Sequence, residues 1–194
     1  MMAPSLAEAA GRLALGLQVL IGRRPAMEAF GDTRDDVVKS FWIALPFFPL
    51  YLWALVSSTP AESVFSDVGL PTRLFVHSIS YAYVWVYWPL IMAGVSTLVG
   101  KPDRWAKYVA AMNWTMAIPF AIQLFMILAV DPMMPSVSEG VRSLVRIWAL
   151  GVHALMIQTF FKTGVLVTLL LVVADFVLAL VLGQVEVFVI LSNA

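Results

Sequence analysis

The fold of this chain is decided by apolar stretches such as Gly164–Ile190, which reads GVLVTLLLVVADFVLALVLGQVEVFVI. A helix rises about 1.5 Å per residue, so roughly 20 apolar residues cross the ~30 Å hydrocarbon core of a bilayer. Four other stretches are long and apolar enough to do the same, namely Val37–Val56, Leu74–Val99, Tyr108–Val130 and Leu144–Phe161. The sequence therefore predicts an all-α, polytopic membrane protein with five transmembrane helices.

The composition supports the same fold class. Hydrophobic residues make up 61% of the 194 residues, charged residues make up 12%, and the mean hydropathy is +0.90. Backbone groups in lipid must satisfy their own hydrogen bonds, which leaves helices or closed barrels, and the apolar runs here are continuous rather than alternating. We expect a cytoplasmic N-terminal segment, residues 1–36, followed by one five-helix transmembrane domain, residues 37–194.

Several classes of function are disfavoured by the residues that the chain lacks. The formal net charge is zero, so no basic surface suited to nucleic acid is expected. There is no cysteine, and the two histidines are far apart in sequence, so neither a metal site nor a cofactor is expected. The sequence contains no metalloprotease, serine-hydrolase or phosphate-loop motif. We expect no catalytic residues and predict that the chain is not an enzyme.

The N-terminal segment has the pattern of an amphipathic helix over residues 5–28, which the Arg24–Pro25 step ends or breaks. Two interpretations of this helix stay open. It lies in the membrane interface, with Arg12, Arg23 and Arg24 in contact with lipid headgroups, or it packs on the cytoplasmic ends of the spans. A cleaved signal peptide is not expected, because the positive charges mostly follow the apolar run instead of preceding it.

The distribution of lysine and arginine predicts the orientation, since cytoplasmic loops carry the excess of positive charge. Of the 12 such residues, nine fall on the side of the N-terminus and three on the other. The nine are Arg12, Arg23, Arg24, Arg34, Lys39, Lys101, Arg104, Lys107 and Lys162, and the three are Arg73, Arg142 and Arg146. We expect the N-terminus in the cytoplasm and the C-terminus outside, in the inner membrane if the chain is bacterial.

Two ionisable residues fall near the middle of the bilayer. His153 precedes Lys162 by nine residues on the fourth span, and Asp175 follows Gly164 by eleven on the fifth. At about 1.5 Å per residue both lie ~13–17 Å from the cytoplasmic face. Two antiparallel neighbouring helices would bring them to the same level, so the sequence predicts an intramembrane polar pair. It is either a proton relay or polar substrate site, or a hydrogen-bonded lock between two helices.

A second polar layer is predicted nearer the outer face. Gln123, Arg146 and Glu186 all fall ~24–33 Å from the inner surface by the same count. An ion pair between Arg146 and Glu186 would fix the register of the last two spans. The aromatic run Tyr81–Trp88 in the second span has two interpretations, which are core packing and a site for stacking a ligand.

The charged turn that runs into a proline-containing first span reads RDDVVKSFWIALPFFP over Arg34–Pro49. Together with five spans, a cytoplasmic N-terminus and a tight last hairpin, this architecture resembles the Yip (Ypt-interacting protein) superfamily in its bacterial form. The resemblance implies a role in membrane organisation or trafficking, and it assigns no functional residue.

The function expected from the sequence is therefore an organising, scaffold or complex-subunit role. The expected partners are the lipid bilayer and either further copies of the chain or other membrane proteins. The alternative is a small transporter or permeation protein that uses His153 and Asp175.

Overall fold

The computed structural model describes residues 3–58 and 68–192, and every regular element in these ranges is helical. Five helical stretches are long and apolar enough to cross a membrane, which confirms the predicted fold class. These stretches are Arg34–Ser57, Leu70–Leu98, Pro102–Val130, Pro135–Phe161 and Val165–Ile190. The fourth begins at Pro135 rather than Leu144, because polar residues that the apolar pattern leaves out still form helix.

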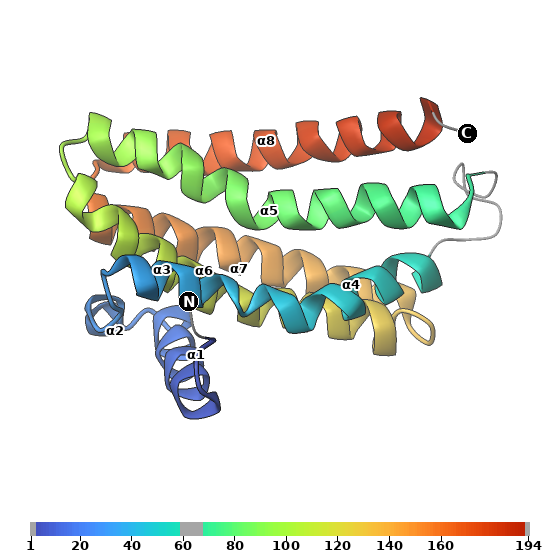
Figure 1. The fold of residues 1–194 in the computed structure, drawn as a ribbon, viewed down its shortest axis with the longest axis horizontal. Coiled ribbons are helices and arrows are strands. Elements are labelled where there is room, and N and C mark those ends of the chain that lie inside the picture. Colours follow the sequence, from blue (N-terminus) through green and yellow to red (C-terminus); the bar gives the residue numbers. More distant parts are fainter. Residues whose placement is uncertain (1–2, 59–67, 193–194) are drawn as a thin grey trace.

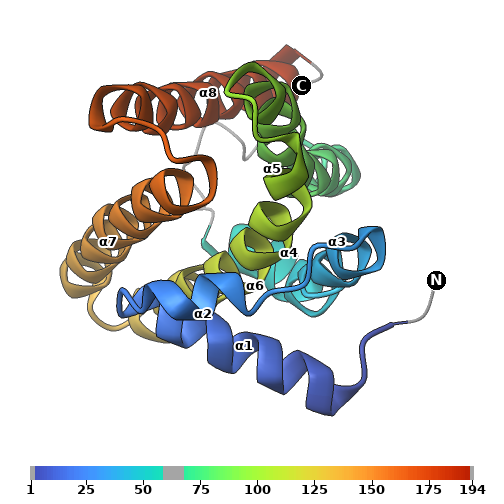
Figure 2. The same ribbon diagram turned by 90° about the vertical axis from the view of Figure 1, so that its left-hand side faces the viewer.

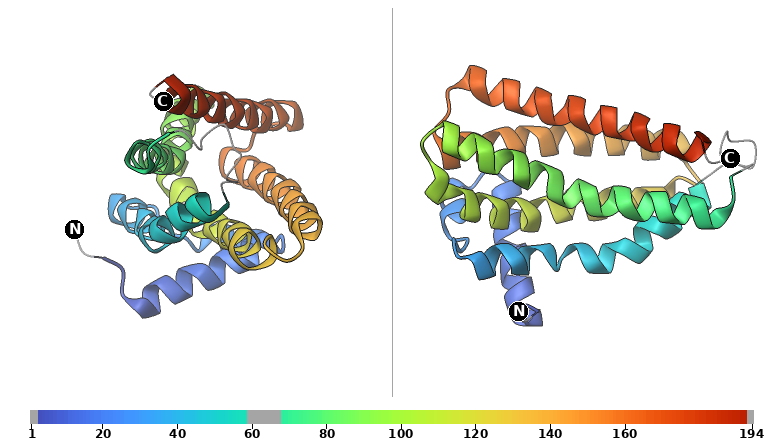
Figure 3. Two further views of the ribbon diagram at one scale, coloured as in Figure 1. Left: turned by 90° about the vertical axis from the view of Figure 1, so that its right-hand side faces the viewer. Right: turned by 45° about the horizontal axis from the view of Figure 1, so that its top comes forward.

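The elements follow one another as a chain of helices. They are α1 (Leu6–Leu20), α2 (Arg24–Glu28), α3 (Arg34–Phe41), α4 (Ala44–Ser58), α5 (Leu70–Leu98), α6 (Trp105–Phe125), α7 (Pro135–Phe161) and α8 (Val165–Ser192). A 3₁₀ turn at Pro102–Arg104 precedes α6, and a π-helical turn at Met126–Val130 follows it. The long helices run side by side as one bundle, and α1 crosses them at a steep angle (Figures 1 and 3).

The α5–α6 and α7–α8 turns lie at the same end of the bundle, which we call the hairpin end (Figure 1). We call the opposite end, where α4 ends and α5 begins, the far end. Helix α6 is central, since it contacts α1, α3, α4, α5 and α7. Its buried residues include Tyr108, Asn113 and Trp114. The end-on view shows the other helices arranged around it (Figure 2).

The first span is two helices rather than one, with a break at Trp42 and Ile43. Pro46 explains the break, because proline has no N–H to bond the carbonyl four residues earlier, that of Trp42. The amide of Leu45 bonds that carbonyl instead, at 3.3 Å. The hydroxyl of Thr33 caps α3 together with Asp36, and each residue satisfies a free backbone amide of the other.

Helix α1 ends at Leu20, before the Arg24–Pro25 step at which the sequence placed the end. Gly22 adopts φ +81°, and the amides of Gly22 and Arg23 bond the carbonyls of Val19 and Gln18 at 2.9 and 3.0 Å. These two bonds form the Schellman ending that glycine favours, because a left-handed residue without Cβ is not strained. The chain then starts the short helix α2, with Pro25 in its first turn.

One face of α1 packs against α6. A Cβ added to Gly16 would lie 3.0 Å from the carbonyl oxygen of Trp114, so glycine allows the two backbones to approach. Val19 and Leu20 are buried beside this contact, and the Trp148 indole N–H of α7 donates to the carbonyl of Leu20 at 3.2 Å. Helix α1 therefore contacts α6 and α7 directly, as expected if it packs on the ends of the spans. Its position relative to a membrane surface stays a prediction.

Helix α8 is the most exposed span. Only 6% of its most apolar 18-residue window is buried within the chain. It starts beside α7 at the hairpin end and crosses to lie beside α5 at the far end (Figure 3). There Ile190 is buried in a small cluster with Val68 and Val76. Its polar side chains therefore contribute much of what holds it to the bundle.

Candidate functional site

The structure brings His153 and Asp175 together, with His153 Nδ1 3.3 Å from Asp175 Oδ2. Three aromatic side chains extend this pair into a network. Tyr108 Oη lies 2.7 Å from His153 Nε2, and the Trp88 indole N–H donates to Tyr108 Oη at 2.8 Å. On the other side, the Tyr87 hydroxyl donates to Asp175 Oδ1 at 2.6 Å. The five residues come from α5, α6, α7 and α8, so one network joins four helices.

The hydrogen bonds of this network have a consistent direction. With a neutral imidazole that carries its proton on Nδ1, Trp88 donates to Tyr108, Tyr108 donates to His153, and Nδ1 of His153 lies 3.3 Å from the Asp175 carboxylate. Tyr87 supplies the remaining donor to the carboxylate. A protonated His153 would instead donate to Tyr108, whose own hydroxyl proton would then need an acceptor elsewhere. In this arrangement the Tyr108 hydroxyl both accepts a hydrogen bond and donates one within the protein.

The centre of the network is shielded by aromatic rings. Tyr108 is fully buried and Trp88 is 3% exposed. The Trp88 and His153 rings meet edge to face at 5.4 Å, and Tyr108 packs on Phe161 with ring centroids 5.0 Å apart. Asp175 is the more open member of the pair, with 17% of its side chain exposed against 8% for His153. Low polarity around the bonds strengthens them and makes any unpaired group costly.

Tyr81 and Trp85 of the aromatic run pack into the protein, whereas Tyr83 is 41% exposed. Tyr81 is 7% exposed, its ring lies 4.9 Å from that of Tyr51, and its hydroxyl donates to the carbonyl of Ala44. Phe120 of α6 also meets Tyr81 and Trp85, at 6.2 and 6.0 Å. These contacts match the core-packing interpretation of this run.

The predicted outer layer needs a correction, because Arg146 and Glu186 have different partners. Arg146 Nε donates to Gln123 Oε1 at 3.2 Å, which joins α7 to α6. Glu186 Oε1 meets His77 Nδ1 of α5 instead. The residue count addressed only depth along each helix, and α8 has crossed from α7 to α5 by the level of Glu186. Depth along a helix does not tell which neighbour is reached.

The three N-terminal arginines, predicted to contact lipid headgroups, are in different surroundings. Arg12 Nη2 pairs with Asp36 at 3.0 Å, and its other terminal nitrogen donates to the carbonyl of Ala29 at 3.3 Å. Lys39 pairs with Glu8 at 3.2 Å across the same α1–α3 contact. Arg23 is exposed, and Arg24 lines a pocket described below. Arg12 thus has protein partners, and the other two remain available to headgroups.

Four residues of these polar contacts were missed in the sequence: Tyr87, Trp88, Tyr108 and His77. Tyr87 and Trp88 belong to the aromatic run that the sequence singled out. The sequence does not show that the Tyr87 hydroxyl and the Trp88 indole N–H have hydrogen-bond partners on other helices. A useful signal was available in His77, an ionisable residue within a span, which defaults to a site with a partner.

The network can hold helices together, and its hydroxyl, imidazole and carboxylate groups are also those that exchange protons. In the part of the chain that the structure describes, no group of three or more metal-binding side chains is found. No protein family, curated protein or solved structure matches this chain.

Proposed function

We propose that this chain is a structural membrane protein that organises other membrane components or serves as a subunit of a complex, and that the His153 network is its internal lock. The observation that carries the proposal is the closure of the network. The Trp88 indole N–H, the Tyr108 hydroxyl and His153 Nε2 are all hydrogen-bonded within the protein, and His153 Nδ1 lies 3.3 Å from Asp175, so each of these polar atoms has a protein partner. A binding site for a polar substrate needs an open polar group.

The position of the network also supports a lock. Helix α8 is the least buried span, and Asp175 ties its middle to α5 through Tyr87 and to α7 through His153. Hydrogen bonds between membrane helices stabilise by about 0.6 kcal/mol on average and up to ~2 kcal/mol. Two contacts on one carboxylate, from Tyr87 and from His153, would fix both the register and the rotation of α8.

The proposal includes the remaining expectations from the sequence. The chain is taken to have no enzymatic activity, to keep its N-terminus in the cytoplasm, and to assemble with copies of itself or with other membrane proteins. The outward face of α8 supports the last point, because it offers a long apolar surface to lipid or to a neighbouring span. The Yip-like role in membrane organisation belongs to the same proposal.

The test of the lock compares two tyrosines one turn apart on α5. Tyr87→Phe removes the donor to Asp175, and we expect it to lower the free energy of unfolding in lipid or detergent by about 1 kcal/mol. Tyr83→Phe is the matched control, because within residues 3–58 and 68–192 its hydroxyl makes no hydrogen bond. Asp175→Asn and His153→Ala should cost more. Unchanged thermal stability in all three network variants would rule out the lock.

The organising role is tested by extraction in native lipid discs and mass spectrometry of what accompanies the chain. Stoichiometric partner proteins, or a homo-oligomer that Asp175→Asn disperses, would support it. A monomer that is extracted without any stoichiometric partner protein would contradict it.

A second candidate, a small proton-coupled transporter, is favoured by one observation. The network offers a series of groups that exchange protons, from Tyr108 through His153 to Asp175, and the carboxylate at its end is partly exposed. Proteoliposomes with an internal pH dye and an imposed potential would report proton flux. Flux that Asp175→Asn abolishes without loss of folding would select the transporter over the lock.

A further inference from the structure

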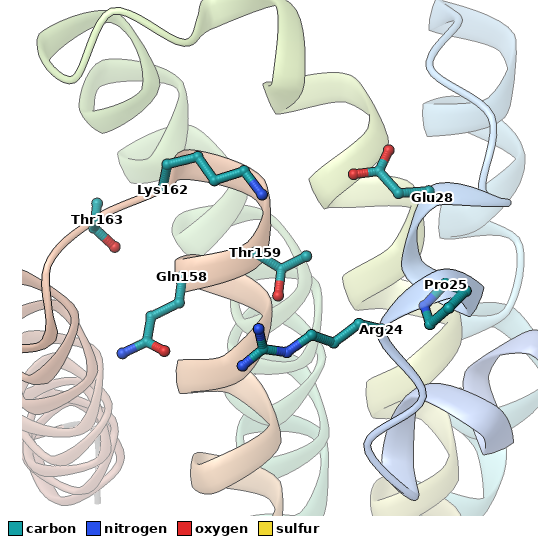
Figure 4. Close-up of a pocket in the computed structure, with 7 residues that line it drawn as sticks. All are labelled: Arg24, Pro25, Glu28, Gln158, Thr159, Lys162 and Thr163. Atoms are coloured by element: carbon teal, nitrogen blue, oxygen red, sulfur yellow. The ribbon is translucent and has the colours of Figure 1, made fainter.

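A pocket of about 510 Å³ opens at the hairpin end, between α2 and the last turn of α7. Arg24 and Glu28 line it from α2, Gln158, Thr159 and Lys162 line it from α7, and Thr163 lines it from the α7–α8 turn. The Arg24 side chain reaches from α2 toward α7, and the Lys162 side chain reaches from α7 toward α2 (Figure 4). Two cations therefore approach one space from opposite sides.

The pocket has an excess of positive charge. Its carboxylate, Glu28, is already engaged by Arg104 at 3.0 Å and by Lys107 at 3.4 Å. Among the residues that the structure describes, neither Arg24 nor Lys162 makes an ion pair. The pocket lining therefore holds two cations and one carboxylate, and Arg104, which pairs with Glu28, also pairs with Asp103 at 3.7 Å. An anion in the pocket would supply the missing negative charge.

The hydrogen-bond donors in the pocket are few and well defined. The Thr159 hydroxyl donates to the carbonyl of Leu155, and the Thr163 hydroxyl bonds Thr168. The donors left for a ligand are the Arg24 guanidinium, the Lys162 ammonium and the Gln158 amide, which has no hydrogen bond within the described ranges. A guanidinium fork and an ammonium together suit the oxygens of a phosphate group.

Lys162 has a left-handed backbone conformation, which favours glycine over a residue with a side chain. It adopts φ +55° at the end of α7, and the other two described residues in this left-handed region, Gly22 and Gly100, are both glycine. A side chain at such a position is strained, and strain of this kind is found where a side chain has a function. The chain thus keeps a cation where glycine would stabilise the turn.

We propose that this pocket binds a phosphate-bearing anion, with the headgroup phosphate of an anionic phospholipid as the source that its location favours. The α7 span ends at Phe161, so Lys162 and Arg24 lie where the headgroups of the adjoining leaflet begin. Basic pockets between helices at this level recognise acidic headgroups. This inference does not depend on the proposed function, because it concerns neither the His153 network nor any partner protein.

The experiment compares three variants of the full chain in discs of neutral phosphatidylcholine, with and without phosphatidylglycerol. Native mass spectrometry counts the phosphatidylglycerol that stays bound on release from the disc. Arg24→Gln and Lys162→Gly should each weaken retention about tenfold, since each removes one charged donor. Lys162→Gly should also raise the thermal stability of the chain, so its loss of binding cannot come from unfolding. Arg34→Gln is the matched control, because Arg34 is exposed and does not line the pocket.

Inorganic phosphate distinguishes the two sources of the ligand. Retained phosphatidylglycerol that only the pocket variants lose supports a lipid site. Thermal stabilisation by phosphate that the same variants abolish, without lipid retention, supports the pocket with a soluble ligand. Equal losses for Arg34→Gln and Arg24→Gln would overturn the proposal in favour of diffuse surface charge, and so would an absence of both lipid retention and a phosphate effect.

Discussion

At the scale of single residues, Tyr108 is the link on which the buried network depends. Its hydroxyl accepts from the Trp88 indole at 2.8 Å and pairs with His153 Nε2 at 2.7 Å. The sequence did not reveal this role, because Tyr108 stands at the start of the predicted third span. Tyrosines near span ends commonly anchor a helix at the membrane interface. The long side chain brings the hydroxyl to His153 from another helix.

We expect Tyr108→Phe to destabilise the protein by at least about 2 kcal/mol, because it leaves both the Trp88 N–H and His153 Nε2 buried without a partner. The loss should appear as a lower midpoint in denaturant titrations of the protein in mixed micelles. Tyr83→Phe again provides the reference. A difference below about 0.5 kcal/mol between the two variants would mean that water or another group replaces the lost hydroxyl.

The pairing of Glu186 with His77 instead of Arg146 gives a second prediction at this scale. A double-mutant cycle on His77→Ala and Glu186→Gln should show a coupling of about 0.5–2 kcal/mol, because the side chains are in direct contact. The matching cycle on Arg146→Met and Glu186→Gln should be additive within about 0.5 kcal/mol. The reverse result would restore the ion pair that the sequence suggested.

At the scale of elements, the docking of α1 depends on glycine at one position. Gly16 faces the backbone of α6, where an added Cβ would lie 3.0 Å from the oxygen of Trp114 and 3.2 Å from Cα of Thr115. Neither atom can rotate away, since both belong to the backbone of a helix. Gly11 on the same helix has no atom within 4 Å of the added Cβ.

These two glycines predict opposite responses to the same substitution. Gly11→Ala should stabilise the protein by about 0.5–1 kcal/mol through helix propensity alone. Gly16→Ala should lose this gain and destabilise the contact of α1 with α6, which is measurable as faster hydrogen exchange of the α1 amides. If both variants respond alike, α1 is not held by this contact.

At the scale of the whole molecule, the basic turns from which the orientation was predicted lie at one end of the bundle. The α5–α6 and α7–α8 turns, which carry Lys101 and Lys162, lie together at the hairpin end (Figure 1). Ion pairs there join Arg104 and Lys107 to Glu28, whereas Arg142 pairs with Asp131 at the far end at 3.7 Å. The positive-inside rule predicts that the hairpin end faces the cytoplasm, and this orientation stays a prediction.

A cysteine-free chain allows this orientation to be measured directly. Single cysteines at Asp103, whose side chain is 73% exposed, and at Met133, which is 77% exposed, mark the hairpin end and the far end. A membrane-impermeant maleimide added to intact cells should label Met133→Cys and reach Asp103→Cys only after lysis. The opposite pattern would invert the proposed topology.

The sequence by itself determined the five apolar helices, their order, and the common level at which His153 and Asp175 meet. Hydropathy identifies the segments that are apolar enough to enter the bilayer. The constant helical rise per residue converts a residue's position in the sequence into a distance along the helix axis. These quantities depend on one helix at a time, so no knowledge of its neighbours is needed.

Only the tertiary structure decided which side chains meet at a given depth. The rotation and crossing of each helix depend on packing against all the others, and so α8 carries Asp175 to Tyr87 and His153 but carries Glu186 to His77. The side of α6 that α1 covers was likewise set by a close approach at Gly16. Contacts of this kind depend on three-dimensional fit, which the spacing of residues along a single helix does not contain.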